Sequence, residues 1–213
     1  MMITYSSTLP FLKYIVFRIV RGHLPNNMVL ILVLGDLHIP HRAAGIPEPF
    51  RKMFAQSGRI HQIISCGNLC DKETYEYLRT ITTDITCVRG EYDEYPKDLK
   101  EVEILEIEDL KFGVIHGHQV VPWGDKDSLA LWQRKLDVDV LISGNTFSSK
   151  IFSFDGKLFA NPGTITGASS SFDPDTTPQF LLLDVQDNRI MAFTYSMEEG
   201  EMRIKKKEWT KGE

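Results

Sequence analysis

An unbroken aliphatic run at residues 28–34, Met-Val-Leu-Ile-Leu-Val-Leu, ends at Gly35-Asp36 and constrains the fold more than any other feature. A run without polar alternation is typical of a strand that is buried on both faces. Further strands are predicted at 60–66 and 85–88. Helices are predicted at 48–55 and 72–79, between these strands. This alternation of strands and helices predicts right-handed crossovers and a parallel sheet.

After residue 100 the pattern changes to strands that follow one another closely. A hairpin-like turn at Glu108-Asp109 and a second one at Asp155-Gly156 favour antiparallel pairs. The expected strands are 102–107, 111–116, 138–143, 151–154, 157–161, 180–185, 189–195 and 202–207, with a helix at 128–136. The polar, Ser-rich segment 164–178 is expected to be a surface loop. Together these elements predict two sheets flanked by helices, in one α/β domain.

Residues 1–27 differ in composition from the rest of the chain. They carry Lys13, Arg18 and Arg21 and no acidic residue. Two of these bases interrupt the apolar stretch 9–20, which is also too short to span a bilayer. We interpret this segment as an N-terminal extension outside the core, with an amphipathic docking segment as the alternative. The domain proper is then 28–213, with no membrane insertion of its own.

Charge and cysteine content restrict the function classes. The formal net charge of −5 offers no basic excess for binding nucleic acid through its phosphates. The chain has three cysteines, and this odd number indicates a reducing, cytoplasmic compartment rather than a disulfide framework.

Polar residues follow five of the predicted strands, beside glycines. They are Asp36 and His38, Asn68, Glu91 and Asp93, His116 and His118, and Asn145, the last followed by Phe147. Ligands of open α/β sheets bind at the carboxyl ends of strands. Carboxylates and imidazoles that meet there suit manganese, zinc or iron.

The order of these motifs resembles the calcineurin-like metallophosphoesterases. The motifs read Asp-x-His, Gly-Asn-x-x-Asp, Gly-Glu-x-Asp, His-Gly-His and Gly-Asn-Thr-Phe. Longer strings at 35–42, 116–125 and 161–163 resemble one branch of that superfamily, the small subunits of retromer. The resemblance implies a four-layer α/β/β/α sandwich and a role in endosome-to-Golgi protein transport. It also implies a cytoplasmic protein, peripheral on endosomal membranes, that binds the α-helical solenoid of the large retromer subunit.

Departures from the superfamily pattern indicate that the chain is not an enzyme. Asn68 stands where active members have a metal-bridging aspartate, and a neutral amide cannot offset the charge between two divalent ions. Tyr92 replaces the histidine that assists the leaving group. Asn145 and Phe147 replace two histidine ligands. The alternative is a metal-dependent phosphodiesterase with a reduced ligand set.

A vestigial metal site remains after these losses, and no catalytic residue is assigned. Its residues are Asp36, His38, Asn68, Glu91 and His116. No cofactor is required for the expected role, although a weakly bound zinc or manganese ion is compatible with these side chains. Equally, His38 and His116 can be core histidines that bind no metal, and Asp36 can brace a loop.

Two apolar surfaces are expected to contact partners. Val120 and Val121 precede Pro122-Trp123, and the resemblance assigns this loop to the large subunit, with Trp123 expected to be tucked into the core. It assigns Met53, Phe54 and Leu182 to a second hydrophobic patch that binds regulatory proteins. The end of the first helix, at Met53-Phe54, is expected to be half-exposed. Plain packing in the core is the alternative for the loop valines and for Leu182. The lysines at 205–207 are typical of a solvated edge strand.

Overall fold

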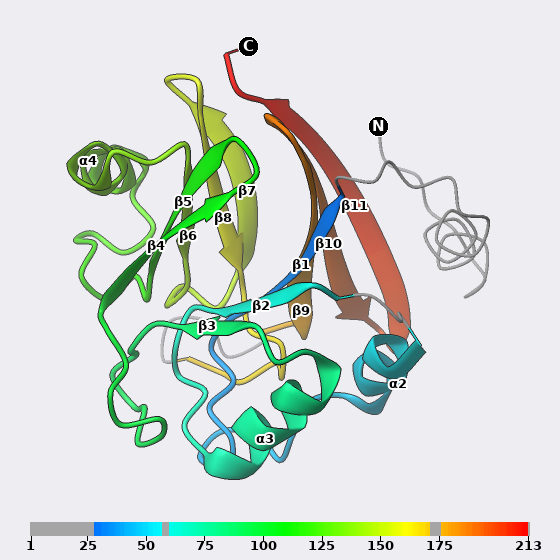
Figure 1. The fold of residues 1–213 in the computed structure, drawn as a ribbon. Coiled ribbons are helices and arrows are strands. Elements are labelled where there is room, and N and C mark those ends of the chain that lie inside the picture. Colours follow the sequence, from blue (N-terminus) through cyan, green and yellow to red (C-terminus); the bar gives the residue numbers. More distant parts are fainter. Residues whose placement is uncertain (1–27, 57–59, 171–175, 213) are drawn as a thin grey trace.

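The computed structural model describes residues 28–56, 60–170 and 176–212, which form two β-sheets with helices outside them (Figure 1). The six-stranded sheet runs in the order β11 (Glu201–Thr210), β10 (Arg189–Glu198), β9 (Gln179–Gln186), β1 (Val29–Leu34), β2 (Gln62–Ser65) and β3 (Ile85–Cys87). The five-stranded sheet runs in the order β4 (Val102–Ile107), β5 (Leu110–Ile115), β6 (Val140–Ser143), β8 (Lys157–Pro162) and β7 (Ser149–Phe154). The expected extension, residues 1–27, lies outside the described residues.

Strand direction brings the carboxyl ends of several strands to one region. β1, β2 and β3 are parallel in the first sheet, and β5, β6 and β8 are parallel in the second. The predicted parallel arrangement is confirmed for β1, β2 and β3. The C-terminal strand β9 then adds to the free side of β1 in the antiparallel direction, with Leu182 opposite Leu32. The first sheet is therefore mixed.

Three apolar clusters separate the layers of the sandwich. On β1, Leu30, Leu32 and Leu34 face the helices α2 (Glu48–Gln56) and α3 (Lys72–Ile81), whereas Ile31 and Val33 face the second sheet. The third cluster joins the five-stranded sheet to α4 (Lys126–Leu136), through Leu129 and Ala130. Figure 1 shows α4 on one side of the paired sheets and α2 with α3 on the other. This is the expected four-layer α/β/β/α arrangement, and it explains why β1 is apolar on both faces.

Aspartate caps set where two of the helices begin. The Asp71 carboxylate accepts the Thr74 N–H at 2.8 Å, and α3 begins at residue 72 as predicted. Asp125 accepts the Ser128 N–H at 2.8 Å, so α4 begins at residue 126 rather than at 128. An acceptor at the N-cap satisfies a backbone donor that the helix itself leaves unpaired. Among the described residues, no helix is long and apolar enough to cross a membrane.

The prediction of a surface loop at 164–178 is wrong for its first part. Thr164, Ile165 and Ala168 are buried. The Thr164 hydroxyl donates to the Asp36 carbonyl oxygen at 2.8 Å, and the Thr166 hydroxyl donates to the Leu37 carbonyl oxygen at 2.8 Å. These hydroxyls hold the segment against the loop that follows β1. The polar residues that suggested exposure instead satisfy buried backbone groups.

Candidate functional site

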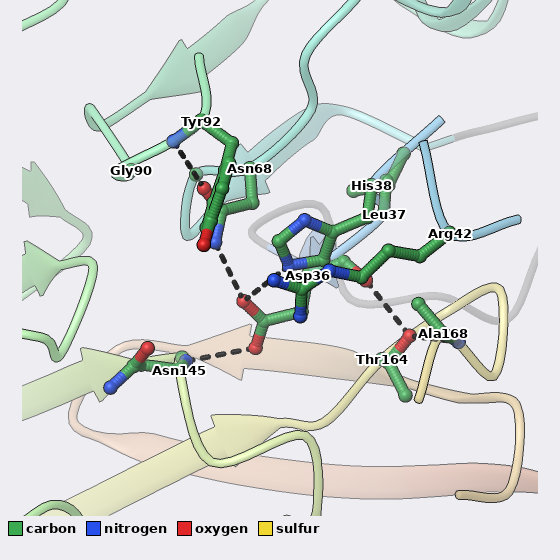
Figure 2. Close-up of polar contacts among 12 residues, drawn as sticks. Asp36, Leu37, His38, Arg42, Asn68, Gly90, Tyr92, Asn145, Thr164 and Ala168 are labelled. Atoms are coloured by element: carbon green, nitrogen blue, oxygen red, sulfur yellow. Dashed lines mark hydrogen bonds and ion pairs between the residues drawn. The ribbon is translucent and has the colours of Figure 1, made fainter. Parts of the chain in front are cut away.

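Side chains from three strand ends meet in a buried polar cluster, part of which Figure 2 shows. Asp36 and His38 follow β1, Asn68 follows β2 and His116 follows β5, and each of them is at most 1% exposed. The backbone of Asp36, His38 and Asn68 has φ between 46° and 55°, in the left-handed region that glycine favours. Residues held in this region cluster at functional sites, because their surroundings must compensate the strain. The prediction that these strand ends converge is confirmed.

The Asp36 carboxylate lies at the centre of the cluster. Its Oδ2 atom accepts the backbone N–H of Asn145 at 2.8 Å, and its Oδ1 atom accepts a hydrogen from the Asn68 amide at 3.3 Å. Complete burial raises the pKa of Asp36 to about 7, although these hydrogen bonds act in the opposite direction. Asp36 therefore connects the loops after three different strands.

The Asn68 amide bridges Asp36 to His116. Its Nδ2 atom lies 3.0 Å from Nε2 of His116, and its Oδ1 atom accepts the Tyr92 N–H at 3.1 Å. Nδ1 of His116 lies 2.6 Å from the carbonyl oxygen of Cys66, which can only accept. The proton of the neutral ring is therefore assigned to Nδ1, and Nε2 accepts from Asn68. Burial lowers the pKa of His116, which favours this neutral form.

His38 is enclosed by aromatic rings. It stacks on Phe147 with ring centroids 5.2 Å apart, and it meets the Tyr92 ring edge-on at 5.4 Å. Burial, followed by the charge of Arg42, lowers the pKa of His38 to about 3. Its Nε2 atom lies 3.9 Å from Oδ1 of Asp36, and neither ring nitrogen has a hydrogen-bond partner within the described part of the chain. His38 is thus a neutral ring held by stacking.

Arg42 and Asp93 contribute to the cluster in ways that the sequence patterns do not indicate. The Arg42 guanidinium lies 5.0 Å above the Tyr92 ring and 5.8 Å from the Phe147 ring, which fits a cation–π contact at the mouth of the site. Asp93 is recognisable as a strand-end acid, but its role is structural, because it accepts backbone N–H groups from the loop that carries Asn68. Glu91, predicted to belong to the vestigial metal site, is an exposed residue beside them.

The donor set does not fit a two-metal centre. Across residues 28–56, 60–170 and 176–212, no group of three or more His, Cys, Asp or Glu side chains is placed to hold a metal ion. Asn145 contributes its backbone N–H to Asp36, and the Phe147 ring cannot coordinate a metal. Two-metal hydrolases need anionic and imidazole donors on both ions to generate a nucleophile. The geometry of this cluster is that of a hydrogen-bonded brace.

The loop between β5 and α4 presents apolar side chains to solvent. Val121 is 75% exposed and Trp123 is 47% exposed, so the expectation that Trp123 is tucked into the core is wrong. Val120 is 1% exposed and packs with Ile115 and Leu129. It therefore supports the loop from below and offers almost no surface for the expected partner contact.

The second expected patch is more buried than predicted. Met53, Phe54 and Leu182 are 7%, 4% and 8% exposed, respectively. The expectation that the end of α2 is half-exposed is wrong, because Phe54 meets the ring of Phe180 edge-on at 5.2 Å. In the isolated chain all three side chains therefore pack in the core.

The fold and the strand-end cluster define the class of this protein. The family model of the calcineurin-like phosphoesterase superfamily domain matches residues 29–188. Among individual proteins, vacuolar protein sorting-associated protein 29 (Vps29) of Schizosaccharomyces pombe is 36% identical to this chain over 189 residues. The match covers 87% of this chain and all of that protein. The chain belongs to the Vps29 family within the calcineurin-like phosphoesterases.

Solved structures of the same family agree with this assignment. Wild-type Vps29 complexed with Zn²⁺ from Entamoeba histolytica is 42% identical, with a TM-score of 0.80 over 84% of this chain and 99% of that one. Vps29 of Chaetomium thermophilum complexed with a cyclic peptide is 34% identical, with a TM-score of 0.76 over 87% of this chain and 99% of that one. The family therefore includes members that have been crystallised with a metal ion and with a peptide ligand.

Proposed function

We propose that this chain is a retromer subunit that acts as a non-catalytic protein-interaction scaffold in endosome-to-Golgi transport. Its membership of the Vps29 family supports this role. The observation that carries the proposal is the exposure of Val121, which is 75% accessible in a loop whose neighbour Val120 is fully packed. An apolar patch that a protein exposes to solvent is typical of a partner contact.

The first docking surface consists of Val121 and Trp123 in the loop between β5 and α4, together with Leu131 on α4. Leu131 is 63% exposed. The Ser128 hydroxyl donates to the Val121 carbonyl oxygen at 3.0 Å, so the loop is tied to the first turn of α4. The partner of this surface is the α-helical solenoid of the large retromer subunit. An apolar centre with a polar rim is typical of such interfaces.

Regulatory proteins bind a second surface, which Met53, Phe54 and Leu182 support from below. Leu182 pairs with Phe193 on β10, and the same face continues to the partly buried Met191 and Ile204. The cyclic-peptide complex of the Chaetomium thermophilum relative supports a peptide-binding surface in this family. In the cell, these contacts hold the chain in the cytoplasm at the surface of endosomal membranes.

Hydrolysis is not part of the proposed role. The position of the leaving-group histidine holds Tyr92, whose backbone N–H is bonded to Asn68. A phosphodiesterase with a reduced ligand set needs a metal-bound water, and the cluster offers too few donors for one. The scaffold requires no cofactor, and the binding of a zinc or manganese ion is not needed for docking.

Substitution of Val121 by Asp tests the proposal. A carboxylate buried against an apolar partner without a counter-charge weakens the complex by about 100-fold or more. Calorimetry with the purified large subunit measures this change, and Ile104→Asp is the matched control, since Ile104 is 50% exposed on the edge strand β4. Equal affinities of the wild type and Val121→Asp would refute the proposed docking surface.

A further inference from the structure

The side chain of Asn68 occupies the point where the loops after β1, β2 and β5 meet. Its Nδ2 atom lies 3.3 Å from Oδ1 of Asp36 and 3.0 Å from Nε2 of His116. These two atoms are the carboxylate and imidazole donors with which a divalent ion at this point would be coordinated. In this chain both of them accept hydrogen bonds from an amide instead.

The orientation of the amide is fixed by all of its partners together. An NH₂ group has two hydrogens, and here each has an acceptor, Asp36 on one side and His116 on the other. The amide oxygen faces the Tyr92 N–H at 3.1 Å. A flipped amide would place its oxygen against a carboxylate oxygen and an imidazole lone pair, and its NH₂ group against a backbone donor. The flipped state therefore loses three hydrogen bonds.

The other atoms around Asn68 that could coordinate a metal ion are also occupied by hydrogen bonds. Oδ2 of Asp36 accepts the Asn145 N–H at 2.8 Å, and Nδ1 of His116 donates to the Cys66 carbonyl oxygen. His38 contributes one ring, which lies flat on Phe147 with 8° between the planes. Zinc takes three or four protein ligands at about 2.0–2.2 Å from nitrogen or oxygen. One unpaired imidazole does not meet that requirement.

We infer that the Asn68 amide takes the place of the metal ion, so that this centre is built to hold its loops together without zinc or manganese. The amide connects a carboxyl group to a neutral imidazole through two donated hydrogen bonds, as a bound cation would connect two ligands. This inference concerns the chain alone and does not depend on any retromer partner.

Asn68→Asp is the informative substitution, because a carboxylate has the shape of the amide but no hydrogen to donate. It would face Asp36 and the lone pair of His116, and both hydrogen bonds would become repulsive contacts. The metal-free variant is expected to melt about 4–10 °C below the wild type. Zn²⁺ is expected to raise its Tm again, since Asp36, Asp at position 68 and His116 would then form a three-ligand set.

Zinc and manganese binding to the full chain are measured by calorimetry and by metal analysis after dialysis, with Tm recorded in EDTA and in excess Zn²⁺. Asn188→Asp, at an exposed turn, controls for the added charge. The variant His116→Ala lacks the imidazole of the centre, so an ion that still binds this variant binds elsewhere, at the surface. We expect no ion at the centre of the wild type, a Tm that is unchanged by EDTA or Zn²⁺, and zinc binding by the triple variant Asn68→Asp, Asn145→His and Phe147→His.

The wild-type measurement decides the inference even if a variant does not fold. One equivalent of zinc or manganese that binds the wild type with micromolar affinity and is lost in His116→Ala would overturn it. A Tm of Asn68→Asp equal to that of Asn188→Asp would overturn it as well. Zinc bound equally by the wild type and His116→Ala lies outside the centre and leaves the inference standing.

Discussion

The Asp93 carboxylate accepts the backbone N–H of Asn68 at 2.8 Å, and thereby ties the loop after β3 to the loop after β2. The same carboxylate accepts the N–H groups of Gly90 at 2.7 Å and Cys70 at 2.9 Å. One side chain therefore satisfies three backbone donors in two loops. Since Asn68 holds Asp36 and His116, Asp93 positions the whole cluster from outside it.

Replacement of Asp93 by Ala is expected to destabilise the fold by about 2–4 kcal/mol, because three partly buried N–H groups lose a charged acceptor. The free energy of unfolding in urea measures the loss. Asp98→Ala, at an exposed position of the same segment, is expected to have an effect below about 0.5 kcal/mol. Similar values for the two variants would show that Asp93 does not brace the loops.

Gly90→Ala tests the close approach of the two loops. A Cβ atom on Gly90 would lie 2.6 Å from the backbone nitrogen of Asn68, so one loop must move. We expect a loss of about 1–3 kcal/mol, typical of overpacking. Gly45→Ala is the control, since a Cβ there meets no atom within 4 Å. If both alanine variants unfold at the same urea concentration, the loops are not packed as described.

The two ion pairs of Asp139 predict that the folded protein loses stability in acid. Its carboxylate binds the Lys157 ammonium at 2.8 Å and the Lys211 ammonium at 2.7 Å, and so connects β8 and the C-terminus to the segment before β6. Burial acts to raise the pKa of Asp139, but the hydrogen bonds from the two lysines outweigh it and lower this pKa to about 2. Because the folded pKa lies below the unfolded value of 3.8, the stabilisation is complete above about pH 4 and is lost as the pH falls towards 2.

Asp139→Asn is therefore expected to destabilise the protein at pH 7 and to have much less effect at pH 2. Urea unfolding at both pH values measures the difference. Asp155→Asn is the control, because Asp155 is 62% exposed and lies 3.9 Å from Arg134 in a surface ion pair, which contributes little. A destabilisation by Asp139→Asn that is independent of pH would contradict the assigned role.

Trp123 offers a second test of the first docking surface. Because it is 47% exposed, Trp123→Ala is expected to leave the Tm within a few degrees of the wild type. The same substitution is expected to weaken binding to the large subunit by about tenfold or more, as truncation of an aromatic contact does at other interfaces. Thermal melting measures the Tm, and surface plasmon resonance on the purified subunits measures the affinity. A Tm that falls by more than a few degrees while the affinity stays unchanged would contradict the assignment of Trp123 to the docking surface.

The sequence predicts the convergence of the cluster because strand direction alone decides it. Parallel β1 and β2 place Asp36 and Asn68 at one edge, whatever the side chains do there. The exposure of single residues is not predictable in this way: Val120 and Val121 are neighbours of the same type, and the turn of the loop buries one and exposes the other. The direction of the Asn68 amide likewise depends on Tyr92 and His116, which lie far from it in sequence.

The central claim is that this phosphoesterase fold has become a binding surface, and hydrolysis of bis(p-nitrophenyl) phosphate in Mn²⁺ tests it most directly. The assay compares the wild type with Asp36→Asn, which keeps the shape of the side chain and removes its charge. We predict the same background rate for both proteins, with no stimulation by Mn²⁺. Metal-stimulated turnover by the wild type that disappears in Asp36→Asn would contradict the account.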